Sequence, residues 1–313
     1  MVVDFHVHVW EPRFIPEPVR RYWAQHAALR TDPPRDPEEI LPRVTVGVSD
    51  PGGRRLLAAL TSNGIDRALL LAVDYAVMSG QEAETPIRET MREYSAIASS
   101  SGGHLEFAGS VDPRREDATE RAIEVLDRYG ARGLKFYPPS GVDPGDPVCD
   151  PLYELLVERD AVAIFHTAIT PGPFDNRLCR PVNVGPVQQR FPELRIVLAH
   201  AGWPAWWDEA VAVAAAHPRT YLELSLWQEE AARDWPSTAA RIVAAVEHVG
   251  ADRLLFASDS MFGARPEREI ERVARWLDQI SGLSAGGRLS REQVGMILDH
   301  NADRLLRSAA QKG

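Results

Sequence analysis

The sequence has little cysteine, and its two cysteines do not form a recognisable framework. Cys149 and Cys179 lie 30 residues apart in Pro-rich sequence, and there is no Cys-x-x-Cys motif. Disulfide-rich secreted domains and thiolate zinc modules need several closely spaced cysteines, so both classes are excluded. A single Cys149–Cys179 bridge stays compatible with the sequence. A chain of 313 residues can also bury a large core without cross-links.

Long hydrophobic runs and clusters of basic residues are also missing. Purely apolar stretches such as residues 68–73 are short, far below the roughly 18 residues that a membrane-spanning helix needs. The 35 Lys and Arg residues are scattered, and 45 Asp and Glu residues bring the net charge to −10, which argues against a nucleic-acid or anionic-membrane surface. The N-terminus MVVDFHVH lacks the features of a secretory signal. We therefore expect a cytoplasmic protein that acts on a small molecule and binds neither nucleic acid nor membranes. A homodimer is compatible with this sequence.

Eight short apolar runs predict eight β-strands. Runs such as ALLLAV, RIVLAH and RLLFAS are nearly continuous, which is typical of a parallel sheet buried on both faces. The predicted strands are Val2–Val7, Arg67–Val73, Leu105–Val111, Gly133–Tyr137, Val162–His166, Arg195–His200, Tyr221–Ser225 and Leu254–Ser258.

Segments with helical periodicity separate the predicted strands, which favours a (β/α)8 TIM barrel. A doubly wound open sheet is the alternative, but it would usually carry a Gly-rich loop after the first strand, where this chain has HVHVWEP. The predicted helices are Arg54–Asn63, Ala118–Tyr129, Pro151–Asp160, Pro204–Ala216, Ser237–Val249 and Glu267–Ile280.

The strand–helix rhythm predicts one domain over residues 1–313 with two additions. Residues 10–52 interrupt the first unit, and Trp10, Phe14, Tyr22 and Trp23 give this insertion enough apolar surface to pack as a lid over the strand ends. Residues 290–313 are predicted to form C-terminal helices that close the bottom or side of the barrel.

Four histidines and one aspartate occur at the ends of predicted strands, where barrel enzymes build their active sites. His6 and His8 lie two residues apart on one strand, so both side chains can face one ion. They join His166, His200 and Asp259. Nitrogen and carboxylate ligands suit zinc and also manganese or iron. Taken singly, a strand-end His is more often a hydrogen-bonded interior residue and Asp259 a helix cap, but chance does not account for the whole set.

Other strand-end residues have more than one interpretation. Lys135 could be carboxylated and bridge two metals, bind an anionic substrate, or pair with a carboxylate such as Glu223. The aromatic residues near the strand ends favour a cyclic or planar substrate but could also be loop packing; they are Trp10, Tyr137, Trp203 and Trp227.

Six motifs, in order along the chain, resemble those of the amidohydrolase superfamily: DFHVH, GLKFYPP, AIFHTA, RIVLAHAGW, LLFASDS and HNADRLL. The set is most similar to the amidohydrolase-2 branch, which includes aminocarboxymuconate-semialdehyde decarboxylase and resorcylate-type decarboxylases. The resemblance implies one divalent metal, usually zinc, held by His6, His8, His166 and Asp259, with His200 beside it as a catalytic residue. Some decarboxylases of the branch begin with Glu-x-His, and the His-x-His form found here does not separate decarboxylation from hydrolysis.

Two reactions fit these residues. In the first, a metal-activated water hydrolyses an ester, lactone or amide, with Asp259 moving the proton and His200 polarising the carbonyl. In the second, a carboxylate is lost without oxidation, and Asp259 or His200 delivers a proton to carbon. The second reaction would favour a guanidinium at the barrel mouth, for which Arg54, Arg177, Arg180 and Arg265 are candidates. We expect the hydrolase, with Lys135, Trp10, Tyr137 and Trp203 contacting the substrate. A barrel that binds a ligand without turnover is disfavoured because both proton-transfer groups are present.

Overall fold

A computed structural model describes residues 1–263 and 265–308, and all eight predicted strands are present. Several end one to three residues earlier than predicted, because the chain turns toward the site before the apolar run ends. A ninth strand of two residues follows Asp259. The strands are β1 Val3–His8, β2 Arg67–Leu71, β3 Leu105–Ala108, β4 Gly133–Phe136, β5 Val162–His166, β6 Arg195–Ala199, β7 Thr220–Glu223, β8 Leu254–Leu255 and β9 Ser260–Met261.

The strands form a closed parallel barrel. Their order is β3-β2-β1-β9 in one sheet and β4-β5-β6-β7-β8 in the other, and every pairing is parallel. A bridge between Gly109 and Leu134 joins the sheets on one side. The backbone N–H of Phe5 joins them on the other side by donating to the carbonyl of Phe256 at 3.0 Å. The predicted TIM barrel is therefore confirmed, and the doubly wound alternative is excluded.

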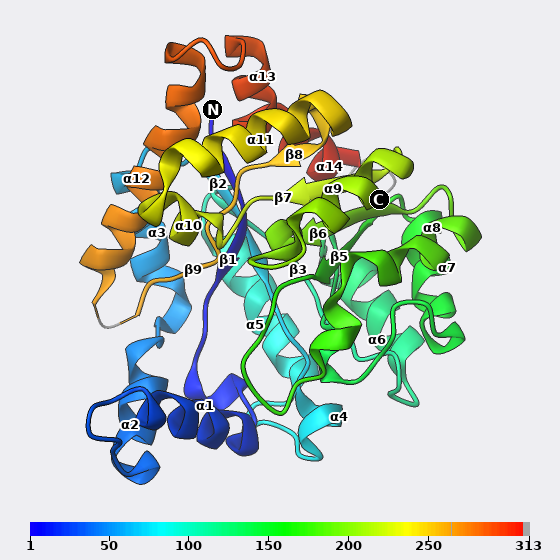
Figure 1. Ribbon diagram of the computed structural model, residues 1–313. Coiled ribbons are helices and arrows are strands. Elements are labelled where there is room, and N and C mark those ends of the chain that lie inside the picture. Colours follow the sequence, from blue (N-terminus) through cyan, green and yellow to red (C-terminus); the bar gives the residue numbers. More distant parts are fainter. Residues whose placement is uncertain (264, 309–313) are drawn as a thin grey trace.

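Helices surround the barrel (Figure 1). The six predicted helices are present, although the segment that begins at Ala118 changes to π-helical geometry over Glu124–Arg128. The sequence prediction named no helix between the second and third strands, where α5 lies. The helices are α1 Glu17–Leu29, α2 Pro37–Gly47, α3 Arg54–Ser62, α4 Ala76–Ser79, α5 Ile87–Ser100, α6 Ala118–Ile123, α7 Asp150–Glu158, α8 Gly185–Arg190, α9 Trp207–Ala216, α10 Trp227–Arg233, α11 Trp235–Val249, α12 Pro266–Ala285, α13 Arg291–Gly295 and α14 Asn301–Ser308. Within the described residues, none of these helices has the length and apolarity needed to cross a membrane.

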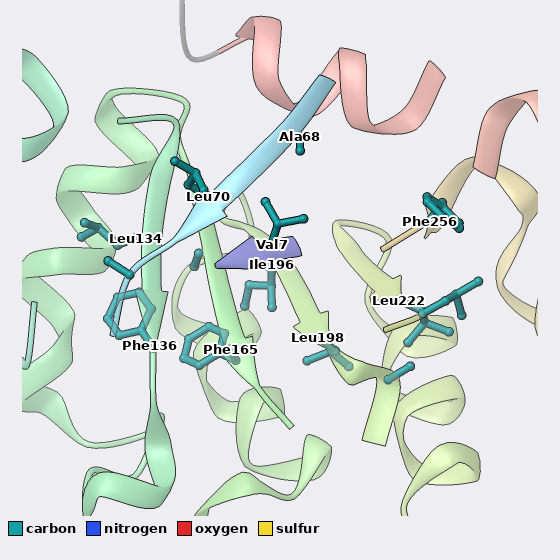
Figure 2. Close-up of a cluster of buried hydrophobic side chains, with 14 of the residues drawn as sticks. Val7, Ala68, Leu70, Leu134, Phe136, Phe165, Ile196, Leu198, Leu222 and Phe256 are labelled. Atoms are coloured by element: carbon teal, nitrogen blue, oxygen red, sulfur yellow. The ribbon is translucent and has the colours of Figure 1, made fainter. Parts of the chain in front are cut away.

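The core has two apolar layers, one on each side of the barrel wall. Outward-facing strand residues such as Leu70, Leu134 and Phe165 pack against the surrounding helices (Figure 2). Inward-facing residues form a second cluster, which α14 closes with Leu305 and Leu306. Figure 1 places α14 at the end of the barrel where β1 begins, as predicted for the C-terminal helices. Residues 309–313 of that prediction lie outside the described residues.

A β-bulge in β1 directs the two histidines of the HVH motif inward. Asp4 is opposite Ala68 and Val7 is opposite Leu70, so three residues along β1 match two along β2. The extra residue reverses the alternation of side chains. Val3 and Phe5 therefore face the interior below the bulge, whereas His6 and His8 face it above the bulge and Val7 faces the helices. Asp4 Oδ1 holds this geometry by accepting from the backbone N–H groups of His6 at 3.2 Å and Ser258 at 3.0 Å.

The insertion after β1 contains α1 and α2, which lie at the end of the barrel toward which β1 points (Figure 1). The ring of Trp10 stacks on that of Trp23 with centroids 5.0 Å apart, and Tyr22 of α1 packs edge-on against Phe174 from the loop after β5. The insertion thus contacts both the strand ends and a neighbouring loop. The lid function of the insertion stays a prediction. The assignment of the whole chain to a single domain also stays a prediction. Cys149 and Cys179 are separate buried thiols, so the optional disulfide does not form.

Gly133 allows β4 and β5 to approach closely, and Gly133→Ala is expected to destabilise the barrel. A Cβ atom at this position would lie 2.1 Å from the carbonyl oxygen of Val162, which is backbone and cannot rotate away. We expect a loss of about 2–4 kcal/mol in the free energy of unfolding, measured by urea denaturation. Gly282→Ala in α12 is the matched control, because no atom lies within 4 Å of its added Cβ, and it should stabilise the protein by up to about 1 kcal/mol. Equal effects of the two substitutions would contradict the packing assigned to Gly133.

Candidate metal centre and substrate cavity

A cavity of about 330 Å³ opens at the carboxyl ends of the strands. All nine residues that the sequence predicted as site residues line it, although they are spread over more than 250 positions. They are His6, His8, Trp10, Lys135, Tyr137, His166, His200, Trp203 and Asp259. Trp227, the fourth aromatic candidate, instead packs against Trp207 and donates its indole N–H to the carbonyl of His200 at 2.9 Å.

Three donor atoms meet at one side of the cavity. Nε2 of His6 lies 3.1 Å from Nε2 of His8, and Oδ1 of Asp259 lies 3.2 and 3.0 Å from these two nitrogens. Donors that share one cation at about 2.0–2.2 Å lie about 3–3.5 Å from one another. The spacing of this triangle, formed by His6, His8 and Asp259, is therefore that of a metal site.

The hydrogen bonds around the triangle show that its atoms carry lone pairs and not protons. His8 Nδ1 lies 2.7 Å from the carbonyl oxygen of Leu71, which can only accept. His6 Nδ1 lies 3.0 Å from the carboxylate of Glu223. Both imidazoles thus carry their proton on Nδ1 and leave Nε2 bare, and the ionised Asp259 also only accepts. Three acceptors without a shared proton repel one another, and a divalent cation is the group that fits between them.

His200 and His166 form a second pair beside the triangle. His200 Nε2 lies 3.0 Å from His166 Nδ1, and His200 Nδ1 lies 2.7 Å from the hydroxyl of Ser225. His6, His200 and Glu223 also bring ligand atoms within 4.8 Å of one another, whereas His166 belongs to neither such group among the described residues. The structure therefore brings His166 to the cavity but not into the triangle. Its assignment as a metal ligand stays a prediction.

The protonation states of the site follow from burial and from the charges within it. Burial lowers the pKa of His6, His166 and His200 well below that of a free imidazole, so these rings are neutral at pH 7. Burial opposes the charge of Asp259, but His6 and His8 outweigh it and bring the pKa of Asp259 to about 2. Neutral imidazoles and an ionised carboxylate are the forms that bind metals.

Left-handed backbone conformations turn several of these side chains into the cavity. Among non-glycine residues of the described chain, five have positive φ, and four of them follow strands at this site. They include His200 with φ of 69° and Asp259 with φ of 52°; the others are Ala201 and Leu226. Each such residue costs about 1–3 kcal/mol. Because both proposed catalytic residues adopt this conformation, their positions depend on the surrounding structure rather than on local preference.

Lys135 is the cationic side chain at the cavity. It is 2% exposed, and its Nζ has no hydrogen-bond partner within the described residues. The pairing with a rim carboxylate that the sequence left open is therefore not formed. Burial lowers the pKa of Lys135 to about 8, while Asp259 and Glu223 act in the opposite direction. The amine is thus mainly protonated at pH 7 and available to an anion.

The arginines considered from the sequence do not reach the cavity. Arg177 pairs with Asp175, and Arg180 pairs with Glu209. Arg54 and Arg265 are exposed. None of the four lines the cavity, so the guanidinium expected for carboxylate binding is not found there.

The sequence analysis gave no site role to Trp23 and Tyr75, which also line the cavity. It named Glu223 only as a possible partner of Lys135, whereas Glu223 contacts His6. Burial raises the pKa of Glu223 to about 7, against the opposing effects of Ser225 and Lys135. The alternation of β7 could have revealed Glu223, because Leu222 faces the helices and the next residue must face the barrel interior.

The comparisons with known proteins cover nearly the whole chain. A family model described as "Amidohydrolase" (Amidohydro_2) matches residues 3–308. No curated protein matches the sequence. Similar solved structures include an uncharacterised TIM-barrel protein from Bordetella bronchiseptica, with 20% identity, a TM-score of 0.69 and 99% of each chain covered.

Two further similar structures are decarboxylases. One is 5-carboxyvanillate decarboxylase from Sphingomonas paucimobilis, with 16% identity, a TM-score of 0.67 and 98% of each chain covered. The other is a dihydroxybenzoic acid decarboxylase from Polaromonas with bound manganese and the inhibitor 2-nitroresorcinol; it has 15% identity, a TM-score of 0.65, and 98% of this chain and 96% of that chain covered. At these identities the likeness shows a common fold.

Proposed function

The chain belongs to the amidohydrolase family, and from this premise we propose that it is a metal-dependent decarboxylase of an aromatic acid. This proposal reverses the order expected from the sequence, where hydrolysis came first. The decarboxylases among the similar structures support the change, since their overall geometry matches this chain over almost its full length. Membership of the family makes the protein an enzyme but does not choose between the two reactions.

The observation that carries the proposal is a buried cation that has no hydrogen-bond partner among the described residues and lies in a cavity lined by aromatic rings. Lys135 supplies the charge for a carboxylate. Flat surfaces come from five rings, which suit a planar substrate: Trp10, Trp23, Tyr75, Tyr137 and Trp203. A volume of about 330 Å³ is at the small end of the range for ligand pockets, which favours a single substituted ring.

His6, His8 and Asp259 would hold the metal, with His166 the expected further ligand. Manganese and zinc both suit this set of nitrogen and oxygen donors, and manganese is bound in the Polaromonas decarboxylase. A bound divalent cation would supply positive charge that holds the oxygens of the acid and stabilises negative charge as the carboxylate leaves.

The protein's own residues would bind the acid and move one proton. Lys135 holds the substrate anion, and the aromatic walls hold the ring and exclude water. When the bond between the ring and the carboxylate breaks, carbon dioxide leaves and the electron pair of that bond stays on the ring carbon. Asp259 is ionised in the free enzyme, so it takes a proton from a substrate hydroxyl or from water and delivers it to that carbon.

Hydrolysis is the second candidate, and one observation favours it. No arginine of the described residues lines the cavity, although a guanidinium is the usual partner of a carboxylate. With the same metal site, Asp259 would take a proton from water and pass it to the leaving group of an ester, lactone or amide. Lys135 would then hold an anionic part of the substrate that does not react.

Carbon dioxide release separates these two functions. Metal-free protein, reloaded with manganese or zinc, should release carbon dioxide from at least one member of a panel of hydroxylated benzoic acids. The same samples should leave aryl esters and lactones intact. Asp259→Asn serves as the inactive control for contaminating enzymes. Hydrolysis of an ester or lactone, with no carbon dioxide from any acid, would overturn the proposal in favour of the second candidate.

Trp203 is expected to contribute to substrate binding through a hydrogen bond. Its indole Nε1 is buried and has no partner within the described residues, so it is free to donate to a substrate oxygen. Trp203→Phe keeps an aromatic ring but removes the donor, and KM should rise about 3–10-fold with little change in kcat, the effect of one lost hydrogen bond. Steady-state kinetics on the best acid of the panel measures this change. A lower kcat with unchanged KM would contradict a pure binding role.

A further inference from the structure

We propose that Glu223 and Ser225 set the positions of the protons on His6 and His200, so that His200 accepts a proton in the reaction and does not donate one. Neither Glu223 nor Ser225 lines the cavity, and both are fully buried behind it. They are thus positioning residues. The part that His200 plays in turnover rests on the proposed function, whereas the proton positions do not.

Glu223 receives hydrogen bonds on all sides. Its Oε2 lies 3.0 Å from His6 Nδ1, 3.1 Å from the backbone N of His200 and 3.0 Å from the hydroxyl of Ser225. Its Oε1 accepts from the backbone N–H of Ser225 at 2.5 Å. Three of these donors meet at Oε2 and one at Oε1, and a carboxylate oxygen only accepts. The arrangement requires that His6 carry its proton on Nδ1.

The direction of the next hydrogen bond follows from the single proton of a hydroxyl group. Ser225 donates that proton to Glu223, so its oxygen can only accept from the ring of His200. His200 Nδ1, 2.7 Å away, must therefore carry the proton, and Nε2 is left with a lone pair. Glu223 thus fixes one imidazole directly and the other through Ser225.

The surroundings of His166 agree with this assignment. Its Nε2 has two partners, the hydroxyl of Thr170 at 2.8 Å and the carbonyl oxygen of Ala168 at 3.1 Å. Thr170 accepts from the hydroxyl of Tyr137 at 3.3 Å, so its own proton is available to Nε2 of His166. With its proton on Nδ1, His166 donates to the bare Nε2 of His200 at 3.0 Å.

These proton positions give His200 and Asp259 different roles in the reaction. A neutral His200 with a bare Nε2 has nothing to donate at the cavity, so it accepts a hydrogen bond or a proton from the substrate. Delivery of a proton to carbon is left to Asp259. The carbonyl-polarising role expected for His200 from the sequence needs a proton on Nε2 and does not fit this geometry.

Nitrogen NMR of the zinc-loaded enzyme tests the inference without any substrate. In protein with 15N-labelled histidine, two-bond proton–nitrogen correlations identify which ring nitrogen carries the proton. We expect His200 in the Nδ1–H form in the wild type. Ser225→Ala should shift His200 toward the Nε2–H form, and Ser225→Thr, which keeps the hydroxyl, should restore the wild-type pattern. Ser101→Ala is the matched control, since it removes another buried hydroxyl that bonds the backbone at β3.

Zinc affinity gives an independent measurement for Glu223. Glu223→Gln cannot accept at all four positions and should weaken zinc binding about 10–100-fold in competition with a chelator. Ser225→Ala leaves the bond from His6 to Glu223 in place, so zinc affinity should change by less than about threefold. A wild-type His200 in the Nε2–H form, or a Ser225→Ala spectrum identical to that of the wild type, would overturn the inference. If a variant fails to fold, the wild-type spectrum is sufficient to test the inference. The NMR result does not depend on whether the enzyme decarboxylates any acid of the panel.

Discussion

Asp259→Asn is expected to reduce turnover by about a thousandfold or more while the fold stays intact. Asparagine is nearly the same size but cannot carry the proton, and general acid–base catalysis contributes about 10²–10⁴-fold. The substitution also removes the negative charge from the triangle with His6 and His8, so the assay needs excess manganese. Steady-state kinetics with thermal unfolding of the same samples measures both effects.

The control for this variant is another buried aspartate. Asp299→Asn changes a carboxyl group on the segment before α14, outside the cavity, and should leave kcat unchanged. If Asp259→Asn keeps more than about a tenth of wild-type turnover with its metal bound, Asp259 is not the residue that moves the proton.

Lys135→Met is expected to have opposite effects on activity and stability. The amine is buried without a hydrogen-bond partner in the described chain, and a buried unpaired charge costs several kcal/mol. In the metal-loaded enzyme, a methionine of similar length should therefore raise Tm by a few degrees. It should also lower kcat/KM by about 10²–10³, since removing one partner of a buried charge pair costs about 2–5 kcal/mol.

Ligands with and without a carboxylate show whether Lys135 binds the substrate anion or only shapes the cavity. Binding of an aromatic acid to Lys135→Met should weaken strongly, whereas binding of a phenol that lacks the carboxylate should change little. Calorimetric titration of both ligands gives the comparison. Equal losses for the two would mean that Lys135 shapes the cavity and does not bind the anion.

The sequence predicted the barrel well because its strands are buried on both faces. Continuous apolar runs leave no doubt about where β5 and β6 lie, and their spacing implies parallel crossovers. The buried residues of α5 recur at helical spacing from Ile87 to Ile97, so the sequence carried the signal for this helix and the prediction did not use it. The bulge in β1 could not be foreseen, because it depends on the register with β2 and on the two hydrogen bonds to Asp4.

The structure brings the predicted site residues to one cavity, while their roles stay predictions. Strand-end histidines converge in any parallel barrel, so their position along the chain was enough to find them. The direction of hydrogen bonds decides whether His200 gives or takes a proton, and this depends on Ser225 and Glu223 across the barrel. One signal in the sequence was overlooked: Lys135 and Lys312 are the only lysines in a chain rich in arginine.

The fate of solvent atoms in the product tests the central claim most directly. The reaction is run in D2O enriched in 18O, and the products are analysed by mass spectrometry. For decarboxylation, we expect no 18O in the aromatic product and one deuterium on the carbon that carried the carboxylate. One deuterium should be incorporated for each molecule of carbon dioxide released. Incorporation of 18O into the organic product, with no carbon dioxide and no deuterium on carbon, would contradict the account and assign the cavity to hydrolysis.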